Sequence, residues 1–439
     1  MEELQGRKSS KQSNIAIDNE ELEGKEAAQT FNVSFIEKIE LLKKSLGKVH
    51  EEDILKTTKA RASKLNLGKE QIIFKPVKEE QVVSAIKKMK GSKAVDYSGI
   101  SPFVLKIAAP VIATLLTYII QGSLAMSEVP DCWKEAKITP LHKKKSRKEV
   151  KNYRPVSILS TPSKILESIV RDQLSEQVEF LKIIPSSQHG FRKDCSTITA
   201  VAAIEHDLKL AKEKKWCAGA VFLDLSAAFD TLDGNILSLK MEEYGASARV
   251  RKWIKSYLSG RRQRVQYQGE ESDTMKNDTG APQGSVLSPF LFLVLVSDME
   301  EALQGMENVK LVSYADDTTI YTWAATAEEV RKNLTEAVER ILTFMQVSGL
   351  AANPEKTNLI YFGSGDTTPI QVGSSLISNQ KEEKLVGMWI SDDLSWEKNL
   401  QEKEATLRNR IGLLRRLSWH LPRHTMLRCM SPIFTSHHI

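Results

Sequence analysis

The chain has 439 residues and a mass of 49.3 kDa, with 41% hydrophobic and 27% charged residues. This composition is typical of folded globular proteins and excludes disordered and fibrous classes. Lys and Arg number 62 and Asp and Glu 56, so the net charge of +6 is small for the length. The four cysteines, at positions 132, 195, 217 and 429, form no CxxC pair, which disfavours a disulfide scaffold and a compact zinc finger.

The N-terminal part of the chain is polar and acidic, and it contains no apolar core of the kind that a secretory signal carries. Apolar residues at Phe31, Phe35, Ile39 and Leu42 recur at helical spacing, and a second helix is expected near residues 78–90. We therefore expect residues 1–100 to form an acidic, helical N-terminal extension.

The stretch 107–127 carries no charged residue, but it includes Pro110, Gln121 and two serines. Ser101 and Pro102 just upstream suit an N-cap and a first helical position. These features predict one or two buried helices between Pro102 and Ser127 rather than a membrane span. The expectation is a soluble intracellular protein.

Positive charge is concentrated between Trp133 and Arg154, a stretch that contains nine basic and two acidic residues. The lysine-rich run 143–148 separates two β-like stretches, 136–141 and 152–160, which predicts a basic loop between two strands. Such a loop can bind phosphates, whereas a solvated loop or a nuclear localisation signal explains the same run equally simply.

Further downstream, strands and helices alternate, which indicates a mixed α and β fold. The pattern predicts helices at 163–181, 196–214, near Ala227, at 233–258 and from Ser288, and strands at 218–225, 263–268 and 273–279, with a turn at 280–284.

Two acidic sites follow β-like segments. Asp224 ends an apolar run, and Asp316 and Asp317 lie at the tip of a β-rich hairpin that extends from 309 to 323. Taken singly, the pair suits a turn and Asp224 suits a helix cap. Brought together, three carboxylates could bind two Mg²⁺ ions, because oxygen ligands suit Mg²⁺ and clustered acids need a compensating cation. A two-metal phosphoryl-transfer site is therefore one hypothesis from the residues alone.

Six sequence blocks occur in an order that resembles reverse transcriptases of non-LTR (LINE-type) retrotransposons, in particular the jockey-like group. The resemblance extends from Trp133 to about Trp396. The blocks are 152–159, 188–192, 222–230, 281–289, 314–317 and 349–357.

The resemblance implies an α+β right-hand polymerase, with fingers, an antiparallel palm sheet and a partial thumb, that copies RNA into DNA. The expected fingers and palm occupy 101–390, and a basic partial thumb occupies 391–439. Implied substrates and partners are dNTPs, an RNA template and a DNA primer, with a separate endonuclease as a further partner. The implied cofactors are two Mg²⁺ ions, with Mn²⁺ as a substitute.

The resemblance also implies roles for individual residues. Asp224, Asp316 and Asp317 fall on the metal-binding, catalytic aspartates, and Lys356 falls in a block that contains a candidate general acid. Phe229 lies where a bulky ring excludes the ribose 2′-hydroxyl, although a core aromatic explains it as well. The remaining nucleotide-binding positions are Arg154, with Lys143 beside it, for the triphosphate, and Gln283 and Gly284 for the nascent base pair.

The C-terminal region resembles a primer-grip hairpin at 385–390, with Leu385 and Gly387, followed by a basic thumb helix. Arg408, Arg415 and Arg416 are its candidate nucleic-acid contacts, and a solvated helix is the alternative. The usual aromatic residue before the hairpin glycine is here Val386. The histidines around Cys429 lack a zinc-knuckle spacing. About 130 residues precede Trp133, too few for the endonuclease that the family usually carries upstream.

The leading hypothesis is thus an RNA-directed DNA polymerase acting in the nucleus. The alternative is a catalytically inactive or domesticated remnant that binds nucleic acid. A small-molecule phosphotransferase is less favoured, because the sequence contains no GxxxxGK[ST] loop.

Overall fold

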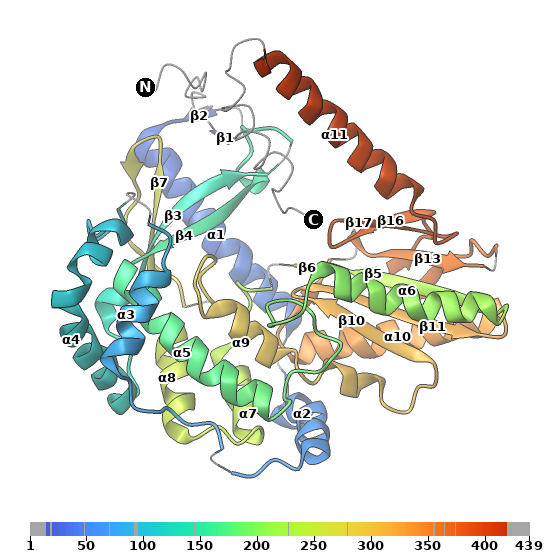
Figure 1. The fold of residues 1–439 in the computed structure, drawn as a ribbon, viewed down its shortest axis with the longest axis horizontal. Coiled ribbons are helices and arrows are strands. Elements are labelled where there is room, and N and C mark those ends of the chain that lie inside the picture. The colour runs from blue at the N-terminus through green and yellow to red at the C-terminus, as the bar shows by residue number, and fades with distance from the viewer. Residues whose placement is uncertain are drawn as a thin grey trace. The chain divides into compact units, whose positions relative to one another are not determined.

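The protein is represented by a computed structural model, which describes residues 15–17, 20–47, 49–69, 71–91, 95–143, 145–226, 228–278, 280–353, 356–363, 365–373 and 375–418. Its elements are drawn in Figure 1. They form two compact units. The first comprises Met1–Pro185, Ser226–Ala302 and Thr343–Ala351, and the second Ser186–Leu225, Leu303–Leu342 and Ala352–Ile439. The boundaries expected at residues 100 and 390 separate polymerase subdomains rather than these compact units, and they stay a prediction.

The first unit consists mainly of helices around one small sheet. Its helices are α1 (Gly24–Leu46), α2 (Glu51–Leu65), α3 (Glu79–Lys88), α4 (Pro102–Met126), α5 (Thr161–Phe180), α7 (Gly234–Glu243), α8 (Ala248–Leu258) and α9 (Ser288–Leu295), with short 3-10 turns at Asp131–Trp133, Val150–Asn152 and Met299–Leu303. A short hairpin, β1 (Ile15–Ile17) and β2 (Glu20–Leu22), precedes α1.

The sheet of the first unit runs β4-β3-β7-β8, with β9 also paired to β7. Its strands are β3 (Glu135–His142), β4 (Tyr153–Leu159), β7 (Arg262–Tyr267), β8 (Glu270–Glu271) and β9 (Met275–Lys276). β3 and β4 are antiparallel, from Ala136 opposite Leu159 to His142 opposite Tyr153, so the basic run forms the loop between them as predicted. Phe31 of α1 packs on Tyr153 and Tyr267 with ring centroids 4.9 Å apart in each pair. The expected N-terminal extension therefore shares a core with this sheet.

Helix α4 is only partly buried, whereas the sequence predicted buried helices between Pro102 and Ser127. It is one continuous helix, capped by the Ser101 side chain, and it buries a stripe that includes Leu105 and Ile120. The opposite side is open, and Val111 is 86% exposed. Among the described helices, α4 is the one long and apolar enough to cross a membrane, a test that core helices of soluble proteins also pass.

The second unit is built on the sheet β10-β11-β5-β13, in which every neighbouring pair is antiparallel, as expected for a palm sheet. The strands are β5 (Cys217–Leu223), β10 (Val309–Tyr314), β11 (Asp317–Ala324) and β13 (Asn358–Phe362). Alternate residues of β5 point to opposite faces. Ala218, Ala220 and Phe222 pack on α6 (Thr197–Glu213), while an added Cβ at Gly219 would meet Leu334 of α10 (Ala327–Val347).

The rest of the second unit comprises two hairpins and a long helix. The elements are β14 (Ile370–Val372) with β15 (Ser375–Ile377), β16 (Glu382–Leu385) with β17 (Met388–Ser391), and α11 (Glu397–Ser418). The two-residue strands β6 (Leu225–Ser226) and β12 (Ala351–Ala352), which pair with each other, each lie where the chain passes from one unit to the other.

Several local predictions differ from the structure. Residues 228–230 form a turn rather than the helix expected near Ala227, and the pattern at 233–258 is two helices, α7 and α8. Helix α2 was not predicted. The histidines and Cys429 in 420–438 lie outside the described residues.

Candidate functional site

The two adjacent aspartates lie at the turn of the β10–β11 hairpin. Tyr314 pairs with Asp317 across the ladder, so Ala315 and Asp316 form the two-residue turn. Ala315 has φ of 58°, a left-handed conformation that is costly for a residue with a side chain. Something must therefore hold this turn in place.

The Gln188 side chain supplies that hold. Its Oε1 accepts hydrogen bonds from the N–H of Ala315 at 3.0 Å and of Gly190 at 2.8 Å, and its Nε2 donates to the Ala315 carbonyl at 3.3 Å. A Cβ added to Gly190 would lie 2.1 Å from the Ala315 nitrogen. The sequence blocks included both residues, but nothing local showed that they contact a turn more than 120 positions away.

Asp224 follows β5 directly, next to the start of β11. Thr318 of β11 pairs with Leu223 of β5, so the next step along both strands leads to Asp317 and Asp224. The structure thus brings together the three aspartates that the sequence grouped. The negative charge of Asp224 acts on both Asp316 and Asp317.

This crowding alters the protonation of the pair. Burial, followed by the charges of Asp316 and Asp224, raises the pKa of Asp317 to about 6. Burial and the Asp224 charge also raise the pKa of the Asp316 carboxyl above its usual range. A nearby cation would therefore stabilise the ionised form of both carboxylates.

Lys356 is the cation that the structure places there. Its Nζ lies 2.7 Å from Oδ2 of Asp224, and its charge opposes the pKa rise of both neighbouring aspartates. The N–H of Asn353 donates to the Asp224 carbonyl at 2.8 Å, which ties the lysine's segment to the end of β5. Lys356, the candidate general acid, thus contacts one of the three aspartates, and its catalytic role stays a prediction.

The chemistry of the donors fits a hard divalent cation, because carboxylate oxygens are the ligands that Mg²⁺ prefers. Within the described ranges, however, no three His, Cys, Asp or Glu side chains are arranged as a metal-binding group. Asp224, Asp316 and Asp317 are thus electrostatically coupled without forming a ready-made ligand cage.

The predicted nucleotide-binding residues Phe229, Gln283 and Gly284 lie in the first unit and are bonded into one cluster. The N–H of Ala281 donates to the Phe229 carbonyl at 2.8 Å, and the N–H of Ser157 on β4 donates to the Gln283 carbonyl at 2.9 Å. Gly284 has φ of 103°, and an added Cβ would lie 3.0 Å from the Ser157 carbonyl oxygen. Glycine is required at this position on both grounds.

The remaining nucleotide-binding candidates extend this cluster. Arg154 is exposed on β4, three residues before Ser157. The Lys143 charge acts on Asp230, the residue after Phe229. The Phe229 ring is half-buried and lies 5.4 Å from that of Phe292, so core packing and a role at the surface are both compatible with its position.

The primer-grip and thumb candidates lie in the second unit. Leu385 is buried in the core beside α6, whereas Gly387 occupies the turn of the β16–β17 hairpin with φ of 90°. Along α11, Arg408 pairs with Glu404, and Arg415 and Arg416 are exposed. These roles stay predictions.

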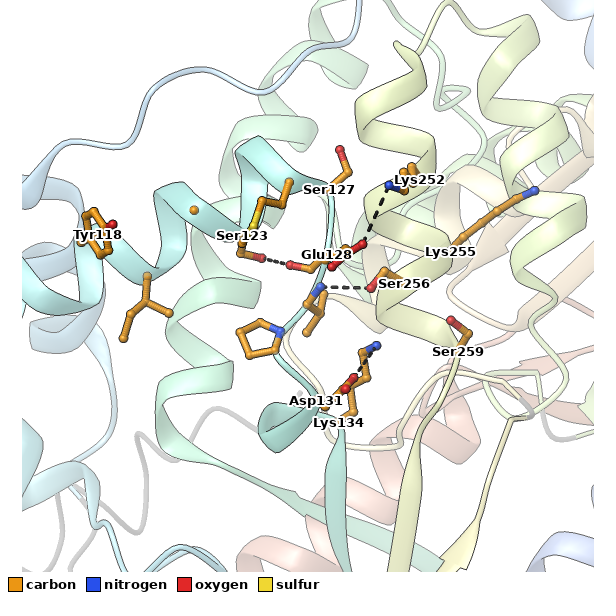
Figure 2. Close-up of a pocket in the computed structure, with 15 residues that line it drawn as sticks. Tyr118, Ser123, Ser127, Glu128, Asp131, Lys134, Lys252, Lys255, Ser256 and Ser259 are labelled. Carbon is orange, nitrogen blue, oxygen red and sulfur yellow. Dashed lines mark hydrogen bonds and ion pairs between the residues drawn. The ribbon is translucent and has the colours of Figure 1, made fainter.

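A separate cavity of about 870 Å³ lies in the first unit between the end of α4 and α8 (Figure 2). Four of its charged groups form ion pairs, Lys134 with Asp131 at 3.1 Å and Lys252 with Glu128 at 3.9 Å. None of the residues predicted for catalysis or nucleotide binding lines it.

Comparison with known proteins identifies the family. The reverse transcriptase (RNA-dependent DNA polymerase) family matches residues 141–390. The chain is 29% identical over 388 residues to a probable RNA-directed DNA polymerase from transposon BS of Drosophila melanogaster, covering 82% of this chain and 42% of that protein. It is 26% identical over 366 residues to the RNA-directed DNA polymerase from mobile element jockey of the same species, covering 81% and 40%.

A jockey polymerase from Drosophila funebris is 27% identical over 353 residues, covering 79% of this chain and 38% of that protein. The chain thus spans about two fifths of the length of these relatives. Enzymes of this family generally use divalent metal ions. Because the family match covers more than half of the chain, the resemblance to non-LTR, jockey-like polymerases is confirmed, and the chain belongs to the reverse transcriptase family.

Proposed function

We propose that the chain is an RNA-directed DNA polymerase that extends a DNA primer on an RNA template with dNTPs. The observation that carries the proposal is the placement of Asp224 and Asp317 at adjoining strand ends, with Asp316 in the intervening turn. The chain belongs to the reverse transcriptase family, and clustered carboxylates suit the binding of divalent ions that promote phosphoryl transfer.

The proposal assigns two Mg²⁺ ions, for which Mn²⁺ can substitute, to Asp224, Asp316 and Asp317. When bound, such ions activate the attacking hydroxyl and stabilise the leaving phosphate oxygen. The carboxylates bind in their ionised form, which for Asp317, whose pKa is raised to about 6, predominates above about pH 6.

The other residues act on the nucleotide. Lys356 Nζ donates a proton to the departing pyrophosphate. Arg154 and Lys143 neutralise the triphosphate, the Phe229 ring excludes a ribose 2′-hydroxyl, and the Gln283–Gly284 backbone lies along the nascent base pair. The thumb arginines Arg408, Arg415 and Arg416 contact the nucleic-acid backbone.

Two wider assignments belong to the same proposal. The enzyme acts in the nucleus, where chromosomal DNA supplies the primer, and the lysine-rich run 143–148 suits nuclear import. A separate endonuclease generates the primer end.

Primer extension on an RNA template tests the function. The native chain is compared with Asp316→Ala/Asp317→Ala in Mg²⁺ and in Mn²⁺. Asp392→Ala/Asp393→Ala, which alters the exposed acidic pair beside β17, is the matched control. We expect metal- and dNTP-dependent product from the native chain and the control, and none from the active-site double variant.

A different result would identify a catalytically inactive, nucleic-acid-binding remnant of a polymerase. If the native chain makes no product, yet binds RNA or DNA with an affinity that falls as salt rises, it holds nucleic acid without copying it.

A further inference from the structure

The turn at 280–284 and the segment 229–230 are joined by three contacts within the first unit. The Ala281 N–H donates to the Phe229 carbonyl at 2.8 Å. A Cβ on Gly280 would lie 2.2 Å from the Asp230 carbonyl oxygen, so the two backbones touch. Finally, Nε2 of Gln283 donates to Oδ2 of Asp230. We name these five residues, Phe229, Asp230, Gly280, Ala281 and Gln283, the clasp.

The Asp230 carboxylate fixes which way the Gln283 amide faces. The side-chain amide has one donor end and one acceptor end, and the donor end is committed to Asp230. In the described part of the chain, the acceptor Oε1 of Gln283 takes no hydrogen bond. The backbone bond from Ser157 to the Gln283 carbonyl, at 2.9 Å, fixes the base of the same side chain. The Gln283 side chain is therefore pre-oriented, and its oxygen Oε1 can accept a hydrogen bond from another donor.

Among the described residues, the side-chain hydrogen bond that the Asp230 carboxylate accepts is the one from Gln283. Burial raises its pKa to about 6, while the Gln283 hydrogen bond and the charges of Lys38 and Lys143 oppose that rise. Burial of a charged carboxylate is costly, and the Gln283 amide is the group that donates a hydrogen bond to offset this cost.

We propose that Asp230 is a positioning residue that orients Gln283 for binding of the incoming nucleotide and thereby sets nucleotide selectivity. The inference rests on the proposed polymerase function. Through the clasp, Asp230 also couples Gln283 to the backbone of Phe229, so loosening it affects both the amide and the ring that faces the sugar.

The test compares Asp230→Ala with Asp230→Asn, because asparagine keeps an acceptor for Gln283 and alanine does not. The first readout is steady-state primer extension with dNTP and with the corresponding rNTP. We expect Asp230→Ala to raise KM for dNTP about tenfold, with a smaller change in kcat and a reduced preference for dNTP over rNTP. We expect Asp230→Asn to stay within about threefold of the native chain.

A double-mutant cycle separates positioning from support of the fold. If Asp230 acts through Gln283, Asp230→Ala has little further effect on KM in a Gln283→Ala background. Additive effects, or equal loss in Asp230→Asn and Asp230→Ala, would overturn the proposal. Asp233→Asn is the matched control, since Asp233 caps α7 by accepting from Asn235 and Ile236 and asparagine caps equally well.

A binding measurement keeps the outcome distinct from failure of the polymerase function. The Kd for complementary dNTP is measured on the chain bound to RNA template and a dideoxy-terminated DNA primer, where no chemistry occurs. A tenfold weaker Kd in Asp230→Ala alone supports positioning even if the native chain extends poorly. An unchanged Kd in Asp230→Ala, when the native chain binds dNTP, refutes positioning and leaves the polymerase proposal standing. Absence of dNTP binding by the native chain refutes both.

Discussion

Nζ of Lys240 lies 2.8 Å from Oδ1 of Asp298, and neither side chain has any exposed surface. The ammonium also donates to the Leu295 carbonyl at 2.9 Å and to Ser348 Oγ at 3.1 Å, which satisfies all three of its protons. Asp298 in turn accepts from Thr57 and Thr58 of α2 at 2.8 and 2.6 Å. A buried ion pair thus joins α2 to α7 within the first unit.

Removing one member of this pair leaves the other charge buried and uncompensated. We expect Lys240→Ala or Asp298→Ala to lower the free energy of unfolding by about 3–5 kcal/mol. Lys240→Met/Asp298→Leu should lose less than the two single changes added together. Urea unfolding midpoints check this. Lys25→Ala, which breaks an exposed pair with Asp273 in the same unit, is the control and should change little.

The left-handed turn at Ala315 depends on a glycine elsewhere in the second unit. Gly190→Ala brings a methyl group to 2.1 Å from the Ala315 nitrogen, so the turn must move and lose its Gln188 bonds. We expect primer extension to fall about a hundredfold, because a displacement of about 1 Å at reacting groups has that effect. Gly122→Ala in α4, where the nearest atom is 3.9 Å away, should keep full activity. Wild-type activity in Gly190→Ala would show that the turn is not controlled in this way.

Lys356 should affect metal binding and turnover in opposite directions. Without its ammonium beside Asp224, the carboxylates attract a divalent ion more strongly, and Mn²⁺ binding followed by electron paramagnetic resonance should tighten several-fold in Lys356→Ala. The kcat of primer extension should fall about 10²–10⁴-fold if the lysine is the general acid. Lys356→Arg keeps the charge, so its Mn²⁺ affinity should match the native chain. Weaker Mn²⁺ binding in Lys356→Ala would contradict the electrostatic argument.

The raised pKa of Asp317 makes the metal-free protein sensitive to pH. An acid whose pKa rises from its ordinary value near 4 to about 6 in the folded state stabilises the fold below about pH 4, and that contribution is lost as the pH rises through 6. The loss is at most about 1–2 kcal/mol, since the group is partly exposed. Unfolding midpoints without metal should therefore fall between pH 4 and 7 by less in Asp317→Asn than in the native chain. Mg²⁺ should restore the native chain's midpoint above pH 6.

The sequence predicted those features that depend on local pattern. The β-like runs on either side of Asp316 and Asp317 indicated the hairpin, and the Ser101 cap placed the start of α4. The grouping of the three aspartates was predictable because Asp224 ends one recognisable strand and Asp316 and Asp317 lie at the turn between two others.

What the sequence did not show depends on contacts between distant segments. Lys240 lies in a stretch that reads as a helix surface, and only the fold reveals that Asp298 and Ser348 bury it. The roles of Gln188 and Asp230 depend on partners at Ala315 and Gln283. Helix α4 was judged by composition, which cannot tell a helix with one covered side from one covered all round.

The pairing of β11 with β5 has a consequence for how copies of a retrotransposon that encodes such a chain lose function. Side chains alternate along a strand, so deleting a single codon between Thr318 and Trp323 would move the later residues of β11 to the opposite face of the sheet. Such a copy keeps an open reading frame and all three aspartate codons, yet its hydrophobic residues face the wrong side of the sheet. Strand length between Asp317 and Ala324 is therefore a more sensitive genomic marker of inactivation than survival of the aspartates.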